Sequence, residues 1–175
     1  MLARSAAALA AVIGSLTFPS APAFAADPVL DGTYRLEFDG ANRTINGVAS
    51  PIANTSATYS FTSSCAGDGC VAHAILLNSN DTEAVSAHNP DLTLQFVDGA
   101  WQMSLQYDSP CEEGGDRNQL LSWTLTPQGG ADLLSGTRTV ATIGNSCAGD
   151  EPGPLAQPMT ATRVGSAAPG VLPMP

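Results

Sequence analysis

The sequence predicts an all-β protein that folds as an up-and-down antiparallel barrel, or a strongly curled sheet, of about eight strands. Three observations predict this class. Short segments alternate apolar and polar residues, turns rich in Gly, Pro, Asn and Asp separate them, and no segment shows a convincing helical period with a cap. Sequential hairpins and bulky aromatic residues at inward positions favour the barrel. A two-sheet β-sandwich is the alternative architecture.

The expected strands are recognised by their alternation. In order along the chain they are TYRLEF (33–38), ATYSFT (57–62), VAHAILL (71–77), LTLQFV (92–97), WQMSLQY (101–107), LLSWTLT (120–126), DLLSGTRTVATI (132–143) and PMTATRV (158–164). In the first strand Tyr34, Leu36 and Phe38 share one face, because successive side chains of a strand point to opposite faces. VAHAILL is apolar at both parities, which indicates a more buried strand. PMTATRV is expected to close the sheet.

Turn residues predict the connections between these strands. Asp98-Gly99 lies between two well-alternating segments and is the strongest hairpin signal in the chain. Gly129-Gly130 separates another pair, and Asn46-Gly47 marks a turn inside the one long connection, residues 42–56. Gly136 lies within an expected strand and therefore predicts a bulge or bend there.

Both ends of the chain are expected to lie outside the fold. Residues 1–25 have the pattern of a secretory signal peptide, in which Arg4 precedes an apolar run and Ala23-Phe24-Ala25 forms a cleavage site. The apolar run is too short to span a bilayer comfortably. We therefore expect one secreted β domain over residues 26–164 and a disordered Pro/Gly/Ala-rich tail over residues 165–175. The expected location is extracellular or in the cell envelope, without stable membrane insertion after cleavage.

The chain is acidic and contains no lysine. Its 6 basic residues, all arginine, and 16 acidic residues give a net charge of −10. Cleavage of the signal peptide would remove Arg4 and no acid, which leaves 5 basic against 16 acidic residues, or −11. Such a surface repels nucleic acid and anionic lipid, so we expect neither as a partner.

The 4 cysteines of an exported chain predict two disulfide bonds. Cys65 and Cys70 flank the turn AGDG between two strands, so they would face each other across a hairpin. Their spacing suits neither a thioredoxin-type pair nor a zinc site. Four cysteines permit three connectivities, among which sequence alone does not choose. The hairpin favours Cys65 with Cys70, which leaves Cys111 with Cys147 to join two loops at one rim of the barrel.

No catalytic motif is present in the sequence. It lacks the G-x-S-x-G, P-loop, H-E-x-x-H and G-x-G-x-x-G patterns, and we expect no catalytic residue, no metal and no cofactor. Acidic residues crowd the expected rim, but their spacing is not that of a calcium loop; they are Glu112, Glu113, Asp116, Asp150 and Glu151. A hydrolase that uses two of these carboxylates is the least favoured of three functional hypotheses.

Aromatic residues at inward positions form the candidate ligand-binding set. They are Tyr34, Tyr59, Phe61, Phe96, Trp101, Tyr107 and Trp123. In a small barrel they would fill the core, and in a roomier barrel they would line an apolar pocket. The first hypothesis is therefore a non-enzymatic binding module for a small apolar or envelope-derived ligand. The second is a protein-interaction or sensor-like module with a solid core, which contacts an envelope protein through its loops.

Three parts of the chain carry a resemblance to known sequences. They are LDGTYRLEFDGANRTING, then YSFTSSC followed by GCVAHA, and then WTLTPQ followed by LLSGTRTV. These segments resemble small exported mycobacterial proteins of unknown function, and they are similar to extracellular sensor-type regions of mycobacterial serine/threonine kinases. The resemblance extends from about Leu30 to Arg163. It implies an actinobacterial secreted or cell-envelope setting, and it supplies no catalytic residues.

Overall fold

A computed structural model describes residues 29–67, 69–80, 91–148, 150 and 153–168. The signal peptide expected at residues 1–25 lies outside this range, as do the last residues of the expected tail. Within that tail, Gly165 ends the last strand and the backbone N–H of Ala168 donates to the hydroxyl of Ser60, 2.9 Å away. Among the described residues, no helix is long and apolar enough to cross a membrane.

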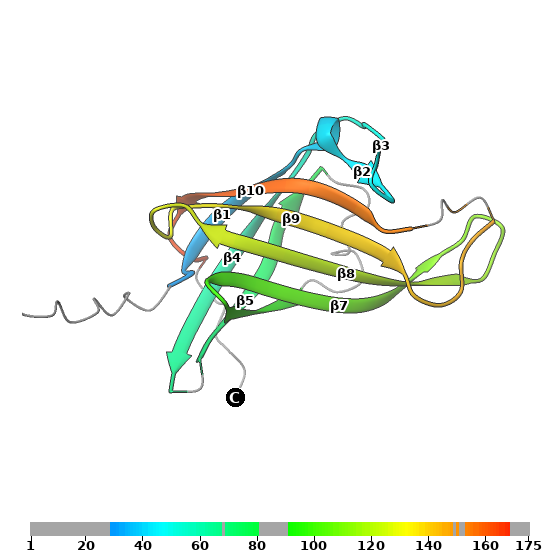
Figure 1. The fold of residues 1–175 in the computed structure, drawn as a ribbon. Coiled ribbons are helices and arrows are strands. Elements are labelled where there is room, and N and C mark those ends of the chain that lie inside the picture. Colours follow the sequence, from blue (N-terminus) through cyan, green and yellow to red (C-terminus); the bar gives the residue numbers. More distant parts are fainter. Residues whose placement is uncertain (1–28, 68, 81–90, 149, 151–152, 169–175) are drawn as a thin grey trace, which may run out of the picture.

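Eight antiparallel strands close a barrel (Figure 1). They are β1 (Gly32–Phe38), β4 (Thr55–Ala66), β5 (Gly69–Ser79), β6 (Asp91–Val97), β7 (Ala100–Pro110), β8 (Asp116–Pro127), β9 (Leu133–Thr142) and β10 (Leu155–Gly165). Each strand pairs with the next one around the barrel, and β10 pairs with β1 to close it. The predicted up-and-down barrel is confirmed, and the closing pair rules out the sandwich.

The long connection between β1 and β4 carries the remaining elements. They are the 3-10 turn η1 (Gly40–Asn42) and the short strands β2 (Thr44–Ile45) and β3 (Val48–Ala49). Because β2 pairs with β10, this hairpin extends the sheet beyond the end of β1. Asn46 and Gly47 both have positive φ, as do Asp98 and Gly99 between β6 and β7. A two-residue type I′ turn requires this conformation, so both predicted turns are confirmed.

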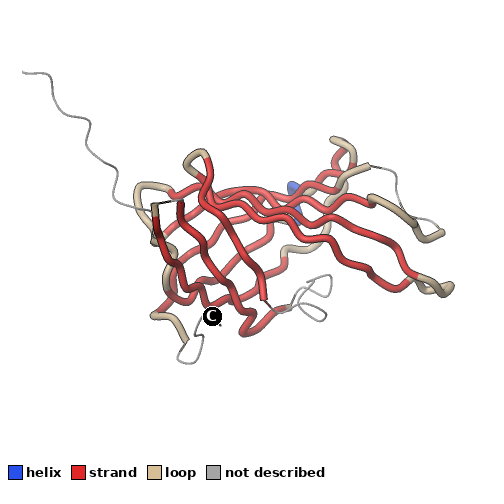
Figure 2. The backbone as a smooth tube through the Cα atoms, turned by 90° about the horizontal axis from the view of Figure 1, so that it is seen from below, coloured by secondary structure: helices blue, strands red, loops and turns tan. Residues whose placement is uncertain are grey.

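The two ends of the barrel differ in their connections. At the end that we name the hairpin end, short turns join β4 to β5, β6 to β7 and β8 to β9. At the opposite end, named the loop end, β1 stops at Phe38, β4 begins at Thr55, and the connections that follow β1, β5 and β9 are long. Strands β7, β8 and β9 project past their neighbours at the loop end, as Figures 1 and 2 show.

Inward side chains fill the barrel with an apolar core, as the alternation predicted. On β6 and β8, for example, Leu92, Leu94, Leu121 and Leu125 are all buried. Burial of one such side chain contributes about 1.5–3 kcal/mol, so the alternating strands supply the main drive for closure of the barrel. VAHAILL buries Ala72 and Ala74 but leaves His73 exposed, so this strand is less buried on its outer face than its composition indicated.

Gly136 does not form the expected bulge. Strand β9 keeps an unbroken register with β8 and β10 through this residue. A Cβ at position 136 would lie 1.7 Å from the carbonyl oxygen of Thr124. Glycine is therefore required because the backbone of β8 occupies the space that a side chain would need.

Both predicted disulfides are confirmed. Cys65 and Cys70 are opposite each other on the β4–β5 hairpin, with their Cα atoms 4.0 Å apart. The Cα atoms of Cys111 and Cys147 are 5.5 Å apart, and their bond ties the loop after β7 to the loop after β9. One bond therefore holds the hairpin end and the other holds the projecting loops of the loop end.

Candidate functional site

Four of the seven candidate aromatic side chains form a continuous chain of ring contacts in the core. Ring centroids are 5.3 Å apart between Tyr34 and Phe61, 6.1 Å between Phe61 and Tyr59, and 5.4 Å between Tyr59 and Trp123. None of the four is more than 3% exposed. Aromatic pairs in such edge and tilted geometries stabilise a core beyond their buried area. In this part of the barrel the rings contact one another and are shielded from solvent.

The other three candidate aromatics lie elsewhere. Phe96 and Trp101 face each other across the β6–β7 hairpin, with ring centroids 5.3 Å apart, at the hairpin end. Tyr107 lies farther along β7 toward the loop end and is only partly buried. The seven residues therefore lie in different parts of the barrel, although all seven belong to the core or pack against it.

A layer of buried polar side chains lies next to the aromatic chain, on its loop-end side. Trp123, Arg138 and Gln157 occupy neighbouring positions on β8, β9 and β10, so their side chains enter the barrel side by side. Gln157 is fully buried and Arg138 is 4% exposed. The guanidinium of Arg138 donates to Oε1 of Gln157 at 2.7 Å and lies over the ring of Phe38, 4.4 Å from its centre.

Three buried polar atoms in this region have no hydrogen-bond partner within the part of the chain that the structure describes. They are Trp123 Nε1, Gln157 Nε2 and Thr55 Oγ1. Thr55 begins β4 at the loop end, opposite Phe38. An unpaired buried polar group costs about 1–3 kcal/mol, and native proteins pair nearly all of them. Trp123 Nε1 and Gln157 Nε2 are therefore candidates to bind a molecule that enters from the loop end, whereas Thr55 lines a hollow on the outer face of the barrel.

The interior becomes more exposed between this layer and the loop end. Leu121 on β8 is buried, whereas Leu105 and Tyr107 on β7 and Val140 on β9 are only partly buried. Leu155 on β10, which pairs with Val140 on β9, is also partly exposed. Apolar walls above a few buried polar groups are the usual make-up of a ligand pocket. These five side chains, Leu105, Tyr107, Leu121, Val140 and Leu155, are named the wall residues. Together with the polar layer of Trp123, Arg138 and Gln157 they are named the mouth site.

Arg138 and Gln157 were missed by the sequence reasoning, which searched for motifs and aromatic residues. The signal that could have found Arg138 is its parity, because it shares the inward face of its strand with Leu134 and Val140. Gln157 shares the inward parity of Met159 and Ala161 but precedes the expected boundary of its strand. A polar residue at an inward position of an alternating strand is therefore as informative as an aromatic one.

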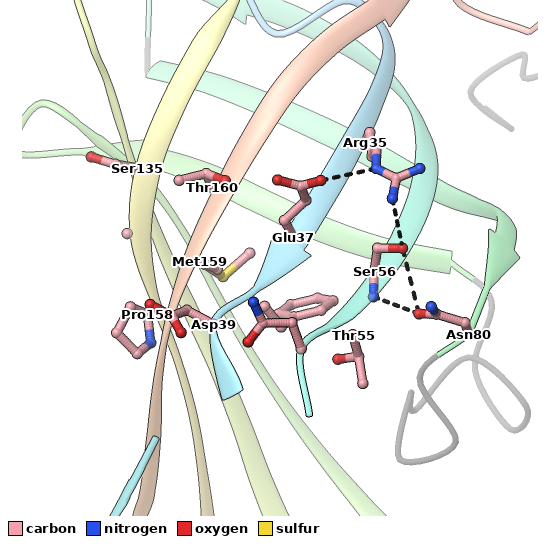
Figure 3. Close-up of a pocket in the computed structure, with 13 residues that line it drawn as sticks. Arg35, Glu37, Asp39, Thr55, Ser56, Asn80, Ser135, Pro158, Met159 and Thr160 are labelled. Atoms are coloured by element: carbon pink, nitrogen blue, oxygen red, sulfur yellow. Dashed lines mark hydrogen bonds and ion pairs between the residues drawn. The ribbon is translucent and has the colours of Figure 1, made fainter. Parts of the chain in front are cut away.

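A hollow lies on the outer face of the barrel and crosses β9, β10, β1 and β4 (Figure 3). Its volume is about 690 Å³. Arg35 donates to Glu37 at 3.1 Å and to the Ser56 hydroxyl at 3.3 Å, and Oδ1 of Asn80 accepts from the backbone N–H of Ser56 at 2.5 Å. These groups already satisfy one another, and an exposed ion pair contributes little to stability. Among the described residues, the hollow has one unpaired buried atom in its lining, Thr55 Oγ1, whereas the mouth site has two, Trp123 Nε1 and Gln157 Nε2.

Acidic residues at the loop-end rim hold the two disulfide-linked loops. Asp150 accepts hydrogen bonds from the backbone N–H of Cys147 at 2.7 Å and from Arg117 at 2.9 Å. The pKa of Asp150 is held below its ordinary value mainly by the hydrogen bond from the Cys147 N–H. The Arg117 guanidinium lowers it further. Glu113 lies within 4.8 Å of both Cys111 and Cys147 sulfurs. Those sulfurs are bonded to each other, so they are not thiolate ligands for a metal.

Comparison with known proteins agrees with this fold. The PknI serine/threonine-protein kinase sensor domain family matches residues 27–175. The serine/threonine-protein kinases PknI of Mycobacterium bovis and Mycobacterium tuberculosis are 30% identical over 164 residues, which is 87% of this chain and 28% of each kinase. The chain thus spans 28% of the length of these relatives. The predicted resemblance to mycobacterial kinase sensor regions is confirmed.

A solved structure supports the same assignment. The monomer form of the M. tuberculosis PknI sensor domain is similar to this chain with a TM-score of 0.64 and 26% sequence identity. The alignment covers 85% of this chain and 96% of that one. The region that matches is described as a sensor domain, which is distinct from a kinase catalytic domain. The chain belongs to the PknI serine/threonine-protein kinase sensor domain family.

Proposed function

We propose that this chain is a non-enzymatic, exported sensor-type module that binds a small molecule at the loop end of its barrel. Membership of a sensor domain family supports a recognition role. The observation that carries the choice of site is a partial loss of burial toward the loop end: Trp123 and Leu121 on β8 are buried, whereas four inward side chains on β7, β9 and β10 are partly exposed. Ligand pockets occur preferentially in such mouths of β-barrels.

This proposal narrows the candidate ligand-binding set. Trp123 would form part of the floor of the site and Tyr107 part of its wall. The remaining members, Tyr34, Tyr59, Phe61, Phe96 and Trp101, would support the site as core. The domain boundaries proposed from the sequence, residues 26–164 with a leading signal peptide, would place the module outside the cytoplasm, in the extracellular space or the cell envelope.

The second candidate function is a protein-interaction module. The observation that favours it is the projection of β7, β8 and β9 past the barrel, with the loops at their ends joined by the Cys111–Cys147 bond. A stapled projection loses little conformational entropy when it binds, which favours recognition of an envelope protein. In that case the loops would contact the partner and the interior would be only a core.

Native mass spectrometry of the protein purified from its own host tests the two functions. We expect the wild type to carry a bound small molecule, and Val140→Trp to lose it because the larger ring fills the mouth. The matched control is Val97→Trp, which makes the same change at an exposed residue near the hairpin end and should keep the ligand. Circular dichroism checks that both variants fold. A wild-type protein with no bound small molecule, but with a co-purified envelope protein, would favour the second function.

A further inference from the structure

We propose that the mouth site binds an amphipathic carboxylate, with the carboxylate on the polar layer and the apolar body between the walls. This inference rests on the proposed function and names its ligand class. Trp123 Nε1 and Gln157 Nε2 would each donate a hydrogen bond to the carboxylate. Neither nitrogen has a partner in the described part of the chain, and both side chains are at least nine-tenths buried.

The direction of the missing hydrogen bonds decides the chemistry of the head group. An indole N–H and an amide NH₂ can only donate, so the group that pairs with them must accept. The neighbouring guanidinium of Arg138 is also a donor and carries a positive charge, and its bond to Oε1 of Gln157 orients the amide so that Nε2 remains to donate. An ionised carboxylate is the acceptor that such a set of donors favours, because charge-assisted hydrogen bonds are roughly twice as strong as neutral ones.

The register of the strands shows that the donors can act on one molecule. Trp123 pairs with Arg138 across β8 and β9, and Arg138 pairs with Gln157 across β9 and β10. Adjacent strands are about 4.8 Å apart, so the three side chains span a distance suited to a single head group. Phe38 contacts both Trp123 and Arg138 and so supports the layer on its hairpin-end side. The head group would therefore approach from the loop end.

The wall residues determine the other half of the ligand. The wall residues Leu105, Tyr107, Leu121, Val140 and Leu155 are apolar or aromatic, and all except the buried Leu121 leave part of their surface uncovered. Removal of apolar surface from water contributes about 25 cal/mol per Å², so an apolar body would gain affinity along these walls. A small inorganic anion would use the polar layer but not the walls. The two features together favour a carboxylate that carries an apolar chain.

Titration calorimetry with three probes tests this ligand class. The probes are decanoate, decyltrimethylammonium, which has a chain of the same length and the opposite charge, and acetate, which has the head group without the chain. We expect decanoate to bind, acetate to bind at least tenfold more weakly, and the ammonium probe to show no saturable binding. Equal binding of decanoate and decyltrimethylammonium would overturn the inference.

Two variants test the donors themselves. Gln157→Glu keeps an oxygen that accepts from Arg138 but replaces the NH₂ donor with a negatively charged oxygen, which repels the carboxylate of the ligand. Trp123→Phe removes the indole N–H and keeps an aromatic ring. We expect each to weaken decanoate binding about tenfold or more, as the loss of a hydrogen bond to a charged group does. Gln95→Leu, on the exposed face of β6, is the control and should bind decanoate like the wild type. Unchanged binding by a folded Gln157→Glu variant would overturn the assignment.

The outcomes separate this inference from the proposed function. If the protein from its own host carries a small molecule that Val140→Trp loses, but decanoate does not bind, the loop-end function holds and the carboxylate assignment is wrong. If neither a co-purified molecule nor any probe binds, the proposed function itself is wrong. Thermal melts of each variant without probe distinguish loss of binding from loss of folding.

Discussion

Removal of the loop-end disulfide should destabilise the protein more than removal of the hairpin-end disulfide. The perturbations are the paired substitutions Cys111→Ala with Cys147→Ala, and Cys65→Ala with Cys70→Ala. The first pair is separated by 36 residues in the sequence and the second by 5. A cross-link stabilises mainly by restricting the unfolded chain, and the restriction grows with the length of the closed ring.

The magnitudes follow from these two ring lengths. In the chain-entropy estimate, the loop-end bond contributes about 4 kcal/mol and the hairpin-end bond about 2 kcal/mol. Since single domains are commonly stable by about 5–15 kcal/mol, loss of the loop-end bond would remove a large share of the total. Cys70 also belongs to the buried core, so its replacement adds a packing loss to the smaller value. The measured difference between the two variants should therefore be less than about 2 kcal/mol.

Equilibrium unfolding in guanidinium chloride measures both effects. We expect a lower midpoint for each variant and a larger m value for the loop-end variant, because its unfolded chain exposes more surface once the long ring is opened. Near-ultraviolet circular dichroism checks that each variant keeps its packed aromatic core. A loop-end variant as stable as the wild type, or a hairpin-end variant that loses more stability, would contradict the ring-length reasoning.

Three further predictions concern single residues. Gly136→Ala should destabilise the fold by about 3 kcal/mol in urea unfolding, because its Cβ would meet the Thr124 carbonyl, whereas Gly130→Ala, which has open space around it, should have little effect. The pKa of Asp150 is lower in the folded protein than in the unfolded chain. Its ionised carboxylate therefore stabilises the fold above about pH 4, and this stabilisation is lost as the pH falls through the folded pKa. Asp150→Asn should therefore lose less stability on acidification than the wild type. If the free energy of unfolding of the variant falls as steeply with decreasing pH, Asp150 is not responsible for the loss of stability in acid. Burial raises the pKa of Tyr34. The neutral side chain therefore stabilises the fold in full below about pH 10, and this stabilisation is lost as the pH rises through the folded pKa. Tyr34→Phe, which also loses the hydroxyl bond to the Ala131 carbonyl, should be less stable at neutral pH and show less further loss in alkali, and a tyrosinate absorbance titration identifies the group.

Most of the fold could be predicted from the sequence because it depends on local patterns. Alternation places an inward face on each strand, and Asp98-Gly99 and Asn46-Gly47 take the positive φ values that tight hairpins need. The Cys65–Cys70 disulfide followed from the hairpin between these two cysteines, and the Cys111–Cys147 disulfide from the two cysteines that remained. Each of these features is determined within a few residues, so it can be recognised without knowledge of the rest of the chain.

The candidate site was less accessible to prediction because it is made by non-local pairing. Gln157 is 19 residues from Arg138, and the two meet only through the register between β9 and β10. The role of Gly136 likewise depends on how closely β8 approaches β9, and no local pattern encodes that distance. Aromatic parity identified inward residues correctly but did not separate those that pack on one another from those near the mouth.

By itself, then, the sequence determined an acidic chain of alternating strands, its turns, its disulfides and its resemblance to kinase sensor regions. Only the tertiary structure decided that β10 closes on β1, that four of the aromatic residues form a chain of contacts, and that Trp123, Arg138 and Gln157 share one buried layer. The physical reason is that alternation specifies which side of a strand is inward, whereas strand register specifies which inward side chains share one level of the barrel.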